Sequence, residues 1–434
     1  MPSVAIIGGG IAGLAAASRL AERGIKATIF EAGAQLGGRA RGIKYKDLKL
    51  DNGQHILLGA YRETLNLLKL AGVQENQVLM RLPLALHMLN LQNKRSFSLK
   101  TCAHLPAPLH LLFGLLLAKG LPFSSRFAAI KFMAWLKLQR FRLKKDLPLA
   151  LLLQRQQQPQ DLIENLWEPL CLAALNTPLA QASAQVFCNV LRDSFNQKKS
   201  DSDLLLPRVD LSRLVADPLA NYVLANSGEI KLNHAIQHIN ASDTGFTLSV
   251  KDKEYAFSHV IIACGPHQVD NLNVTSNSNP ISIAQAQLSY QPITTIYLQY
   301  ADNSKLPQAM LGLVGSLAQW VFDRGQLCGQ HGLMAVIISA HAPLEMTQDA
   351  LAEKIAGELK NLFPELGSPI WTKVITEKRA TFSCDANLLR PKALVMVNVY
   401  LAGDYVAGDY AYSNYPATIE GAVRSGINAA NLVN

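Results

Sequence analysis

The first 31 residues constrain the fold more than any other part of the chain. Residues 4–7 form a continuous apolar run, which is typical of a strand buried on both faces of a parallel sheet. A glycine-rich turn over 8–13 follows, and the Ala- and Leu-rich segment 12–23 has the composition of a helix. Residues 26–30 form the second predicted strand, which ends at Glu31. This order predicts a strand–turn–helix–strand unit and an α/β fold.

The glycines of this turn have the spacing of a dinucleotide-binding motif. Gly8, Gly10 and Gly13 would let the backbone approach a pyrophosphate, which also meets the free N–H groups of the helix that follows. Glu31 stands 18 positions after the last glycine, where a carboxylate accepts hydrogen bonds from ribose hydroxyls and repels a 2′-phosphate. The motif therefore favours FAD or NAD over NADP, without choosing between them. A glycine turn in an unrelated βαβ protein is the structural alternative.

Length and composition limit the number of domains and the classes of protein that remain possible. A chain of 434 residues is too long for one ordinary core and predicts two or three domains. With 49% hydrophobic and 17% charged residues, the chain is neither disordered nor fibrous. Its six cysteines show no metal-ligand spacing, so we expect reduced thiols and no metal site. The N-terminus has no basic region before its apolar segment, so we expect no secretory signal and a cytoplasmic location.

The positive charge is concentrated in one segment. Residues 101–145 contain eight Lys or Arg and no acidic residue, against a net charge of +9 for the chain. Residues 101–118 are uncharged, but Pro106 and Pro108 limit a helix there to about 12 residues, or ~18 Å, which is too short to span a membrane. We expect peripheral docking on an anionic membrane. A buried helix with a solvated basic end is the alternative.

The membrane interpretation names particular side chains. We expect the apolar contacts with the acyl boundary to be Leu111, Leu112, Phe113, Leu115, Leu116 and Leu117. Basic charge would also suit a nucleic acid, but no nucleic-acid-binding motif accompanies it, so we expect no nucleic-acid partner.

A family resemblance appears after the second predicted strand. Leu36-Gly37-Gly38-Arg39 follows Glu31, and with it the sequence resembles the flavin-containing amine oxidase and phytoene desaturase superfamily. In that superfamily, the arginine after the glycine pair contacts the FAD pyrophosphate, a contact suited to a forked guanidinium. Four further segments resemble, in chain order, the part that passes the flavin ring, the strand near adenine and the two halves of the C-terminal flavin motif: 51–55, 233–239, 403–404 and 417–422.

The resemblance implies a set of FAD-binding residues. They are Gly8, Gly10, Ile11, Ala12, Gly13, Glu31, Ala32, Gly38, Arg39, Gly53, Gln54, His55, Ile236, Gly403, Asp404, Ala417, Thr418 and Ile419. It also implies an amine oxidase-like two-domain flavoprotein. We expect a Rossmann-type FAD-binding domain and a mixed α+β substrate-binding domain. The FAD-binding domain would comprise residues 1–75, 205–265 and 380–434, and the substrate-binding domain residues 76–204 and 266–379.

More selective segments narrow the resemblance to one branch. Residues 167–178, 206–212, 320–325 and 416–426 resemble the squalene-associated branch, the bacterial hydroxysqualene dehydroxylases. This resemblance implies that reduced FAD delivers a hydride to hydroxysqualene while the hydroxyl leaves as water, giving squalene, and that an external donor reduces the FAD. Alternatives are a carotenoid-type desaturase, an amine oxidase and a membrane-docked flavoprotein without catalysis.

Three residues are candidates for proton transfer in such a reaction. His55 would lie beside the flavin, where it could act as an acid or base or simply pack against the ring. Glu168 and Asp323 lie in the branch-specific segments and could protonate a leaving hydroxyl if burial raises their pKa values. We expect either carboxylate to form a structural ion pair with a neighbouring arginine, such as Arg324, and proton transfer is the alternative. Four tyrosines in 405–415 could form an amine cage, shape a prenyl channel or pack within the loop.

Overall fold

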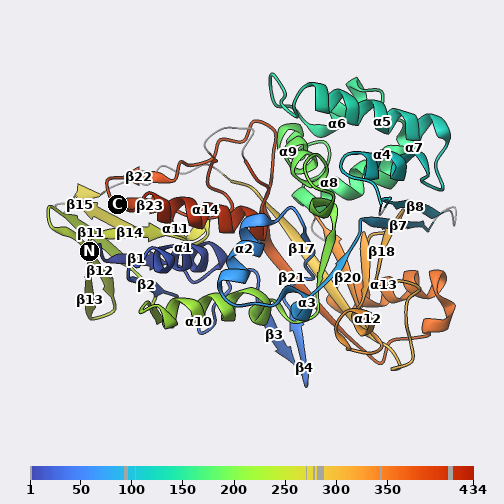
Figure 1. The fold of residues 1–434 in the computed structure, drawn as a ribbon. Helices are drawn as coiled ribbons and strands as arrows, with labels where there is room; N and C mark the ends of the chain where they lie inside the picture. The colour runs from blue at the N-terminus through green and yellow to red at the C-terminus, as the bar shows by residue number, and fades with distance from the viewer. Residues whose placement is uncertain are drawn as a thin grey trace.

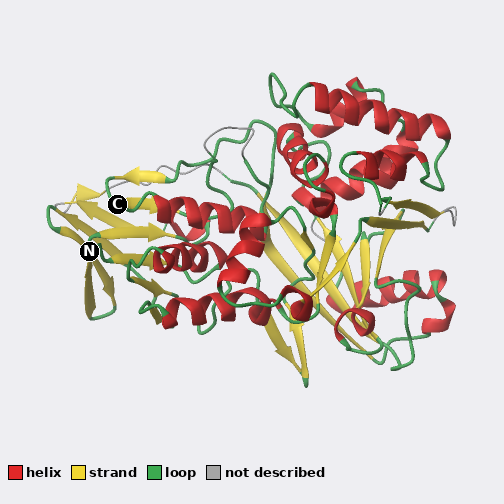
Figure 2. Ribbon diagram, viewed as in Figure 1, coloured by secondary structure: helices red, strands yellow, loops and turns green. Residues whose placement is uncertain are grey.

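The computed structural model describes most of the chain. The described residues are 2–91, 96–102, 104–269, 271–276, 279–280, 288–342, 345–408 and 414–434. Figure 1 shows two regions joined through long connections, and Figure 2 shows that strands and helices are present in both. The α/β fold expected from the sequence is confirmed.

The first region is built on a six-stranded, mostly parallel sheet. In spatial order its strands are β10 (Glu229–Lys231), β2 (Ala27–Phe30), β1 (Val4–Ile7), β14 (His259–Ile262), β23 (Val399–Leu401) and β22 (Leu394–Met396). All neighbours pair in parallel except β22 and β23, so the carboxyl ends of the central strands meet at one edge. Helices α1 (Ile11–Glu22), α10 (Asp217–Ala225) and α14 (Ile419–Asn431) pack together beside this sheet.

A smaller sheet packs against the first. Its strands are β13 (Lys253–Phe257), β12 (Gly245–Val250), β11 (His238–Ser242), β15 (Asn273–Ser276) and β16 (Asn279–Pro280). Phe30 of β2 meets Tyr255 and Phe257 of β13 edge-on, with ring centroids 5.1 and 5.8 Å apart. Because β15 pairs with β11, strand pairing in this sheet crosses the predicted domain boundary at residue 265.

The second region contains a seven-stranded mixed sheet. Its strands are β21 (Trp371–Phe382), β17 (Tyr290–Gln299), β20 (Leu333–Ser339), β19 (Trp320–Asp323), β18 (Met310–Val314), β7 (Ala85–Asn90) and β8 (Ser96–Lys100). Ile296 and Leu298 of β17 pack in one core with α13 (Gln348–Leu362), whereas Tyr297 faces another core. The alternating sequence of β17 predicts a half-buried strand, and this is wrong at its centre, because both faces are covered.

A helical layer, defined as α4 to α9, covers the other side of the second region (Figure 1). It consists of α4 (Leu109–Leu116), α5 (Phe123–Leu138), α6 (Leu149–Arg155), α7 (Gln160–Leu162), the π-helical turn η1 (Ile163–Trp167), α8 (Glu168–Leu175) and α9 (Ala184–Phe195). The start of α4 just after Pro108 confirms the expected short helix. None of the helices in the described ranges has the length and apolar character that a membrane span requires.

The expected membrane contacts are only partly exposed. Leu111 and Leu115 are buried within the layer, so the expectation that both meet the acyl boundary is wrong. They lie on the inner face of α4, whereas Phe113 and Leu117, which were also expected to contact the membrane, lie on the outer face. Arg126 is not a free surface charge, since its guanidinium donates to the carbonyls of Leu116 and Leu121.

The remaining elements are short. They are β3 (Gly42–Tyr45), β4 (Leu48–Asp51), β5 (Leu57–Leu58), β6 (Leu79–Leu82), β9 (Leu204–Pro207), α2 (Arg62–Leu70), α3 (Glu75–Val78), α11 (Pro266–Val269), α12 (Arg324–Cys328), η2 (Lys199–Ser202), η3 (Ser212–Ala216) and η4 (Pro364–Leu366). β5, β9 and β6 form a three-stranded sheet, and β3 pairs with β4. The six cysteines are free thiols, as expected.

Candidate functional site

The turn between β1 and α1 has the shape of a phosphate cradle. Gly10 caps α1 without a side chain, and a Cβ placed on it would meet no protein atom within 4 Å. A Cβ on Gly13 would instead lie 2.0 Å from the carbonyl oxygen of Gly8, so this glycine is needed for the helix to approach the turn. Open space at Gly10 and a helix N-terminus together fit the pyrophosphate of a dinucleotide.

Glu31 is held at the edge of this turn. One carboxylate oxygen accepts from the backbone N–H of Gly9 and the other from that of Gly33, each at 2.7 Å. Both oxygens keep further lone pairs, so they can still accept from ribose hydroxyls. The segment near Ile236 lies alongside, because Asn233 donates to the carbonyl of Gly33 at 3.0 Å. The side chain of Ile236 is buried, and Ala32 is exposed beside Glu31.

The segment with the paired glycines lies directly against the turn. The N–H of Gly37 donates to the carbonyl of Gly9 at 2.9 Å, and a Cβ on Gly38 would stand 3.3 Å from the Cα of Gly10. Arg39 reaches across to Asp404, with 2.7 Å between Nη2 and a carboxylate oxygen. The Arg39 side chain remains 42% exposed and has N–H groups to spare for a phosphate. We call residues 8–13, 31, 37–39 and 403–404 the cradle.

The C-terminal helix aims its N-terminus into the same region. Thr418 caps α14 by accepting from the N–H of Gly421, while Ala417 and Ile419 flank the cap. Gly403 donates to the hydroxyl of Ser425 at 3.0 Å, which holds the end of β23 against α14. The predicted FAD contacts at 403–404 and 417–419 therefore lie on two segments that are bonded to each other.

Sequence reasoning missed the part played by Glu420. This residue is 1% exposed, and one carboxylate oxygen accepts from both the N–H and the hydroxyl of Thr64, at 2.9 and 2.7 Å. The other oxygen accepts from the Arg424 Nε at 2.7 Å and from the N–H of Glu63. Glu420 thus joins the N-termini of α2 and α14. The signal available in the sequence was an acidic residue two positions after Thr418, a residue type that commonly caps a helix N-terminus.

The segment expected to pass the flavin ring carries a neutral histidine. The His55 Nδ1 lies 2.7 Å from the carbonyl oxygen of Gly53, so this nitrogen carries the proton. Burial lowers the pKa of His55, with a further contribution from the charge of Arg39. Opposite the segment, the hydroxyl of Thr295 is buried without a protein partner, 3.8 Å from where a Cβ on Gly53 would lie. This unpaired hydroxyl fits a polar ligand group at the ring.

A buried ion pair, also missed by sequence reasoning, supports that segment. Arg324 Nη1 donates to the Gln54 side-chain oxygen at 2.8 Å and lies 3.7 Å from a carboxylate oxygen of Asp51. Burial raises the pKa of Asp51 to about 6, while the charge of Arg324 acts in the opposite direction. The hydroxyl of Tyr297 donates to the Asp51 carbonyl at 2.9 Å. No local pattern could reveal this pair, because its members are 273 positions apart (324 minus 51).

Asp323 occupies a structural position. One oxygen accepts from the N–H of Gln326 at the start of α12, and the other accepts from the N–H of Leu306 at 2.8 Å and the side-chain amide of Gln326 at 2.7 Å. The expected ion pair between Asp323 and Arg324 is wrong, because these amide donors take both oxygens and Arg324 turns toward Asp51. A catalytic role for Asp323 stays a prediction.

Glu168 lies in the helical layer. It is exposed at the first position of α8, where desolvation and the neighbouring Glu164 raise its pKa. Its role as a proton donor also stays a prediction. The tyrosines of 405–415 are divided: Tyr405 is buried with its hydroxyl on the carbonyl of Cys264, and Tyr415 donates to Asp193. Tyr410 and Tyr412 lie outside the described residues.

The structure brings some of the predicted site residues into direct contact and places others in a neighbouring segment. The glycine turn, Glu31, Arg39 and Asp404 are linked by direct hydrogen bonds into one cradle. His55 lies in the adjoining ring segment, and the charge of Arg39 acts on it. Among the residues that the structure describes, no cluster of His, Cys, Asp or Glu could hold a metal ion.

Comparison with known proteins decides the family. The sequence profile described as "Flavin containing amine oxidoreductase" matches residues 11–434. The chain belongs to this family. It is an FAD-dependent oxidoreductase, as the sequence predicted, and it has the family's two-domain fold.

Individual relatives agree with the predicted branch. The chain is 28% identical to the hydroxysqualene dehydroxylase of Zymomonas mobilis, over 98% of each chain. It is 27% identical to that of Rhodopseudomonas palustris, over 99% of this chain and 98% of the relative. Among solved structures, cyclohexylamine oxidase from Brevibacterium oxydans superposes with a TM-score of 0.71 at 15% identity, covering 99% of this chain and 98% of the oxidase. The resemblance to the dehydroxylase branch is thereby confirmed.

Proposed function

We propose that this enzyme reduces hydroxysqualene to squalene, using FADH2 as the hydride source. When bound, the reduced cofactor supplies a hydride to the carbon that carries the hydroxyl. The C–O bond breaks, the hydroxyl takes up a proton, and the products are squalene, water and oxidised FAD. An external electron donor must then return the FAD to its reduced form.

One observation favours the dehydroxylase reaction over the other reactions of the family. Arg324, in the branch-specific segment 320–325, bonds directly to Gln54 in the segment expected to pass the flavin. A segment that resembles the dehydroxylase branch is thus bonded to the segment that we expect to pass the flavin ring, which supports the proposal. The near full-length similarity to two hydroxysqualene dehydroxylases supports the same reaction.

The chain's own groups have definable tasks in this reaction. With Nδ1 bonded to Gly53, His55 presents Nε2 as a neutral acceptor, so we propose that it orients the substrate or a water. The reaction requires a site closed to water, because water would otherwise capture a developing allylic cation. Arg324 and Asp51 fix the backbone that carries His55.

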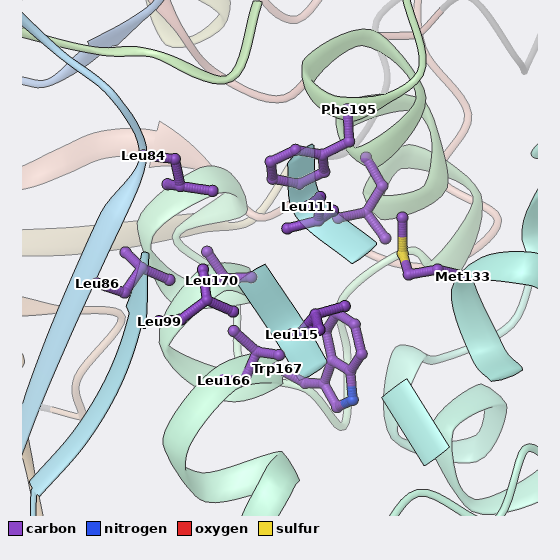
Figure 3. Close-up of a pocket in the computed structure, with 11 residues that line it drawn as sticks. Leu84, Leu86, Leu99, Leu111, Leu115, Met133, Leu166, Trp167, Leu170 and Phe195 are labelled. Carbon is purple, nitrogen blue, oxygen red and sulfur yellow. The ribbon is translucent and has the colours of Figure 1, made fainter. Parts of the chain in front are cut away.

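An amine oxidase reaction is less well supported. The described pocket of the second region is lined by hydrocarbon, thioether and indole side chains, which favours an apolar substrate over an amine (Figure 3). A carotenoid-type desaturase would suit an apolar pocket equally well, and the chain is 25% identical to 15-cis-phytoene desaturase of Glycine max. The two reactions differ in the direction of hydride transfer.

Isotope transfer tests that direction. Flavin reduced with deuteride at N5, under anaerobic conditions with low exchange, should place deuterium on one carbon of the squalene formed from hydroxysqualene. Squalene that forms without label would contradict direct hydride transfer. Oxidation of a polyprene by the oxidised enzyme, with no squalene formed from hydroxysqualene, would instead identify a desaturase.

We further propose that the helical layer docks peripherally on the cytoplasmic face of an anionic membrane. Of the large apolar side chains that are exposed on or beside α4 and α5, five lie in two rows with i, i+4 spacing: Leu109, Phe113, Leu117, Phe123 and Phe127. We call them the outer stripe. Exposed basic residues lie in the same layer, among them Lys131, Lys137, Arg140, Arg142, Lys144 and Lys145. Apolar side chains near basic residues suit a surface of anionic headgroups.

A further inference from the structure

Strand β17 carries two adjacent threonines that differ in their hydrogen bonding. Thr294 and Thr295 are both fully buried. The Thr294 hydroxyl lies 2.8 Å from that of Thr376 and 3.0 Å from Nε2 of His341. The Thr295 hydroxyl has no hydrogen-bond partner among the residues that the structure describes. Because successive side chains of a strand point to opposite faces, Thr295 shares its face of the sheet with Tyr297 and not with Thr294.

The face that carries Thr295 is held against the segment expected to pass the flavin ring. The Tyr297 hydroxyl accepts from the backbone N–H of Asp51 at 3.2 Å and donates to its carbonyl at 2.9 Å. A Cβ placed on Gly53 would lie 3.8 Å from the Thr295 Oγ1 and 3.8 Å from the His55 Cε1. Apart from the chain neighbours of Gly53, no other described atom would lie within 4 Å of it. One position therefore touches both the Thr295 hydroxyl and the His55 imidazole.

The unpaired Thr295 hydroxyl requires a physical explanation. Buried polar groups are nearly always hydrogen-bonded, because an unpaired one loses its bonds to water and gains nothing in return. A valine would have the same shape without this cost. Thr294 shows that the same strand can bond a buried hydroxyl where the protein supplies partners. A partner supplied by a ligand would explain the hydroxyl of Thr295.

The donors and acceptors at this position suit a ligand hydroxyl. Nδ1 of His55 donates to the Gly53 carbonyl, so Nε2 is left as an acceptor, whereas the Thr295 hydroxyl can donate. A ligand hydroxyl satisfies both, since it donates one hydrogen bond and accepts others. A cation is disfavoured, because burial and the charge of Arg39 both lower the pKa of His55.

We propose that the Thr295 hydroxyl binds the oxygen of the substrate and so places its C–O bond at the flavin ring. The inference rests on the proposed function, in which this oxygen leaves as water. Thr295 donates a hydrogen bond to the oxygen, and the bond strengthens as negative charge develops there while the C–O bond breaks. The threonine keeps its own proton, so FADH2 and hydroxysqualene still give FAD, squalene and water.

Removing the hydroxyl while keeping the shape of the side chain tests this contact. Thr295→Val should lower kcat/KM for hydroxysqualene by about tenfold, because a hydrogen bond to the leaving oxygen is lost. Thr295→Ser keeps a hydroxyl and should stay within about threefold of wild type. Thr294→Val makes the same exchange on the opposite face of β17 and should keep kcat/KM within about twofold. FAD content, measured by flavin absorbance, should be equal in wild type and all variants.

Binding to the oxidised holoenzyme separates recognition from turnover. The oxidised enzyme has no hydride to deliver, so hydroxysqualene should bind without reacting, and the change in flavin absorbance gives its Kd. Squalene, which lacks the oxygen, is the comparison ligand in the same detergent. Wild type and Thr294→Val should bind hydroxysqualene about tenfold more tightly than squalene, and Thr295→Val should bind the two about equally. A wild type without this preference, or a Thr295→Val enzyme that keeps it, would overturn the proposal.

The stability of the substrate-free holoenzyme gives a readout that needs no ligand. Thr295→Val should keep or raise the midpoint of chemical denaturation, because it removes an unpaired hydroxyl, whereas Thr294→Val should lower it. A fall in Thr295→Val as large as that in Thr294→Val would reveal a protein partner for the hydroxyl and overturn the proposal. If Thr295→Val does not fold, Thr295→Ala and Thr295→Ser form a second pair that differs by the hydroxyl alone.

The contact and the proposed function can fail separately. If wild type does not reduce hydroxysqualene but only Thr295→Val loses the preference over squalene, the proposed reaction is wrong and the contact stands. If wild type reduces hydroxysqualene and Thr295→Val matches it in kcat/KM, the contact is wrong and the proposed reaction stands.

Discussion

The cradle and the helical layer differ in the kinds of contact that they offer to a ligand. The cradle consists of backbone N–H groups and charged side chains, such as Glu31 and Arg39, held by hydrogen bonds of 2.7–2.9 Å. The helical layer encloses a pocket without an ionisable side chain. The cradle therefore suits a charged dinucleotide, whereas the apolar side chains of the helical layer suit contact with hydrocarbon.

The largest effect should come from reversing the charge of the helical layer. Exchanging Lys137, Arg140, Arg142, Lys144 and Lys145 for Glu should abolish flotation with anionic liposomes, since each basic residue contributes up to about 1 kcal/mol near such a surface. Wild type should float, and added salt should release it. FAD content should stay unchanged, because these residues lie outside the cradle. A variant that floats like wild type would show that this surface is not the membrane contact.

The next largest effect concerns the Asp51–Arg324 ion pair, which supports the segment expected to pass the flavin ring. Arg324→Leu leaves Asp51 buried without its cation, so we expect a loss of about 3–5 kcal/mol in the free energy of unfolding. Chemical denaturation followed by circular dichroism measures it. Arg41→Leu, at an exposed arginine, is the control and should change stability by less than about 0.5 kcal/mol. A loss below about 1 kcal/mol for Arg324→Leu would refute the importance of this pair.

A smaller effect tests the cradle itself. Glu31→Ala should weaken FAD binding by about 1–3 kcal/mol, the scale of a lost charge-assisted hydrogen bond. Titration of apoprotein with FAD, monitored by quenching of flavin fluorescence, gives the Kd. Glu22→Ala changes an exposed carboxylate at the end of α1 and should bind FAD normally. Unchanged FAD affinity in Glu31→Ala would remove Glu31 from the binding site.

The smallest effect is a pH dependence. The folded protein holds a proton on Asp51 up to about pH 6, whereas an ordinary aspartate has a pKa of 3.8. The free energy of unfolding should therefore fall as the pH rises from about 4 to 6, because the folded state binds the extra proton. Asp51→Asn should flatten this part of the curve, and the exposed control Asp47→Asn should not. An Asp51→Asn curve that keeps the wild-type slope would contradict the raised pKa.

The difference between the cradle and the helical layer also explains which features could be predicted from the sequence. The glycine turn, Glu31 and the strand–turn–helix unit follow from local spacing, because their partners lie within about 30 residues. The pocket and the Asp51–Arg324 pair arise only when distant segments pack together, and no local period encodes them. Leu111 and Leu115 show the limit of such predictions. When apolar residues lie all around a helix, the sequence does not reveal which face is buried, because that depends on the neighbouring elements.

Asp323 illustrates a second limit. A carboxylate in a selective segment suggested chemistry or an ion pair, yet its oxygens cap α12 and bind the backbone of Leu306. An Asp three positions before Gln326 is an ordinary helix-capping pattern, and it was open to that interpretation from the sequence. A selective segment can thus mark a structural support as readily as a reacting group.

Anaerobic reoxidation of the flavin tests the central claim most directly. The purified enzyme is reduced with one equivalent of dithionite, hydroxysqualene is added without oxygen, and flavin absorbance and squalene are measured together. We predict that oxidised flavin returns in a one-to-one ratio with squalene, and that an added amine or a fully hydrogenated alcohol gives neither. Flavin that stays reduced in the presence of hydroxysqualene, while the oxidised enzyme accepts hydride from a polyprene or an amine, would contradict the account.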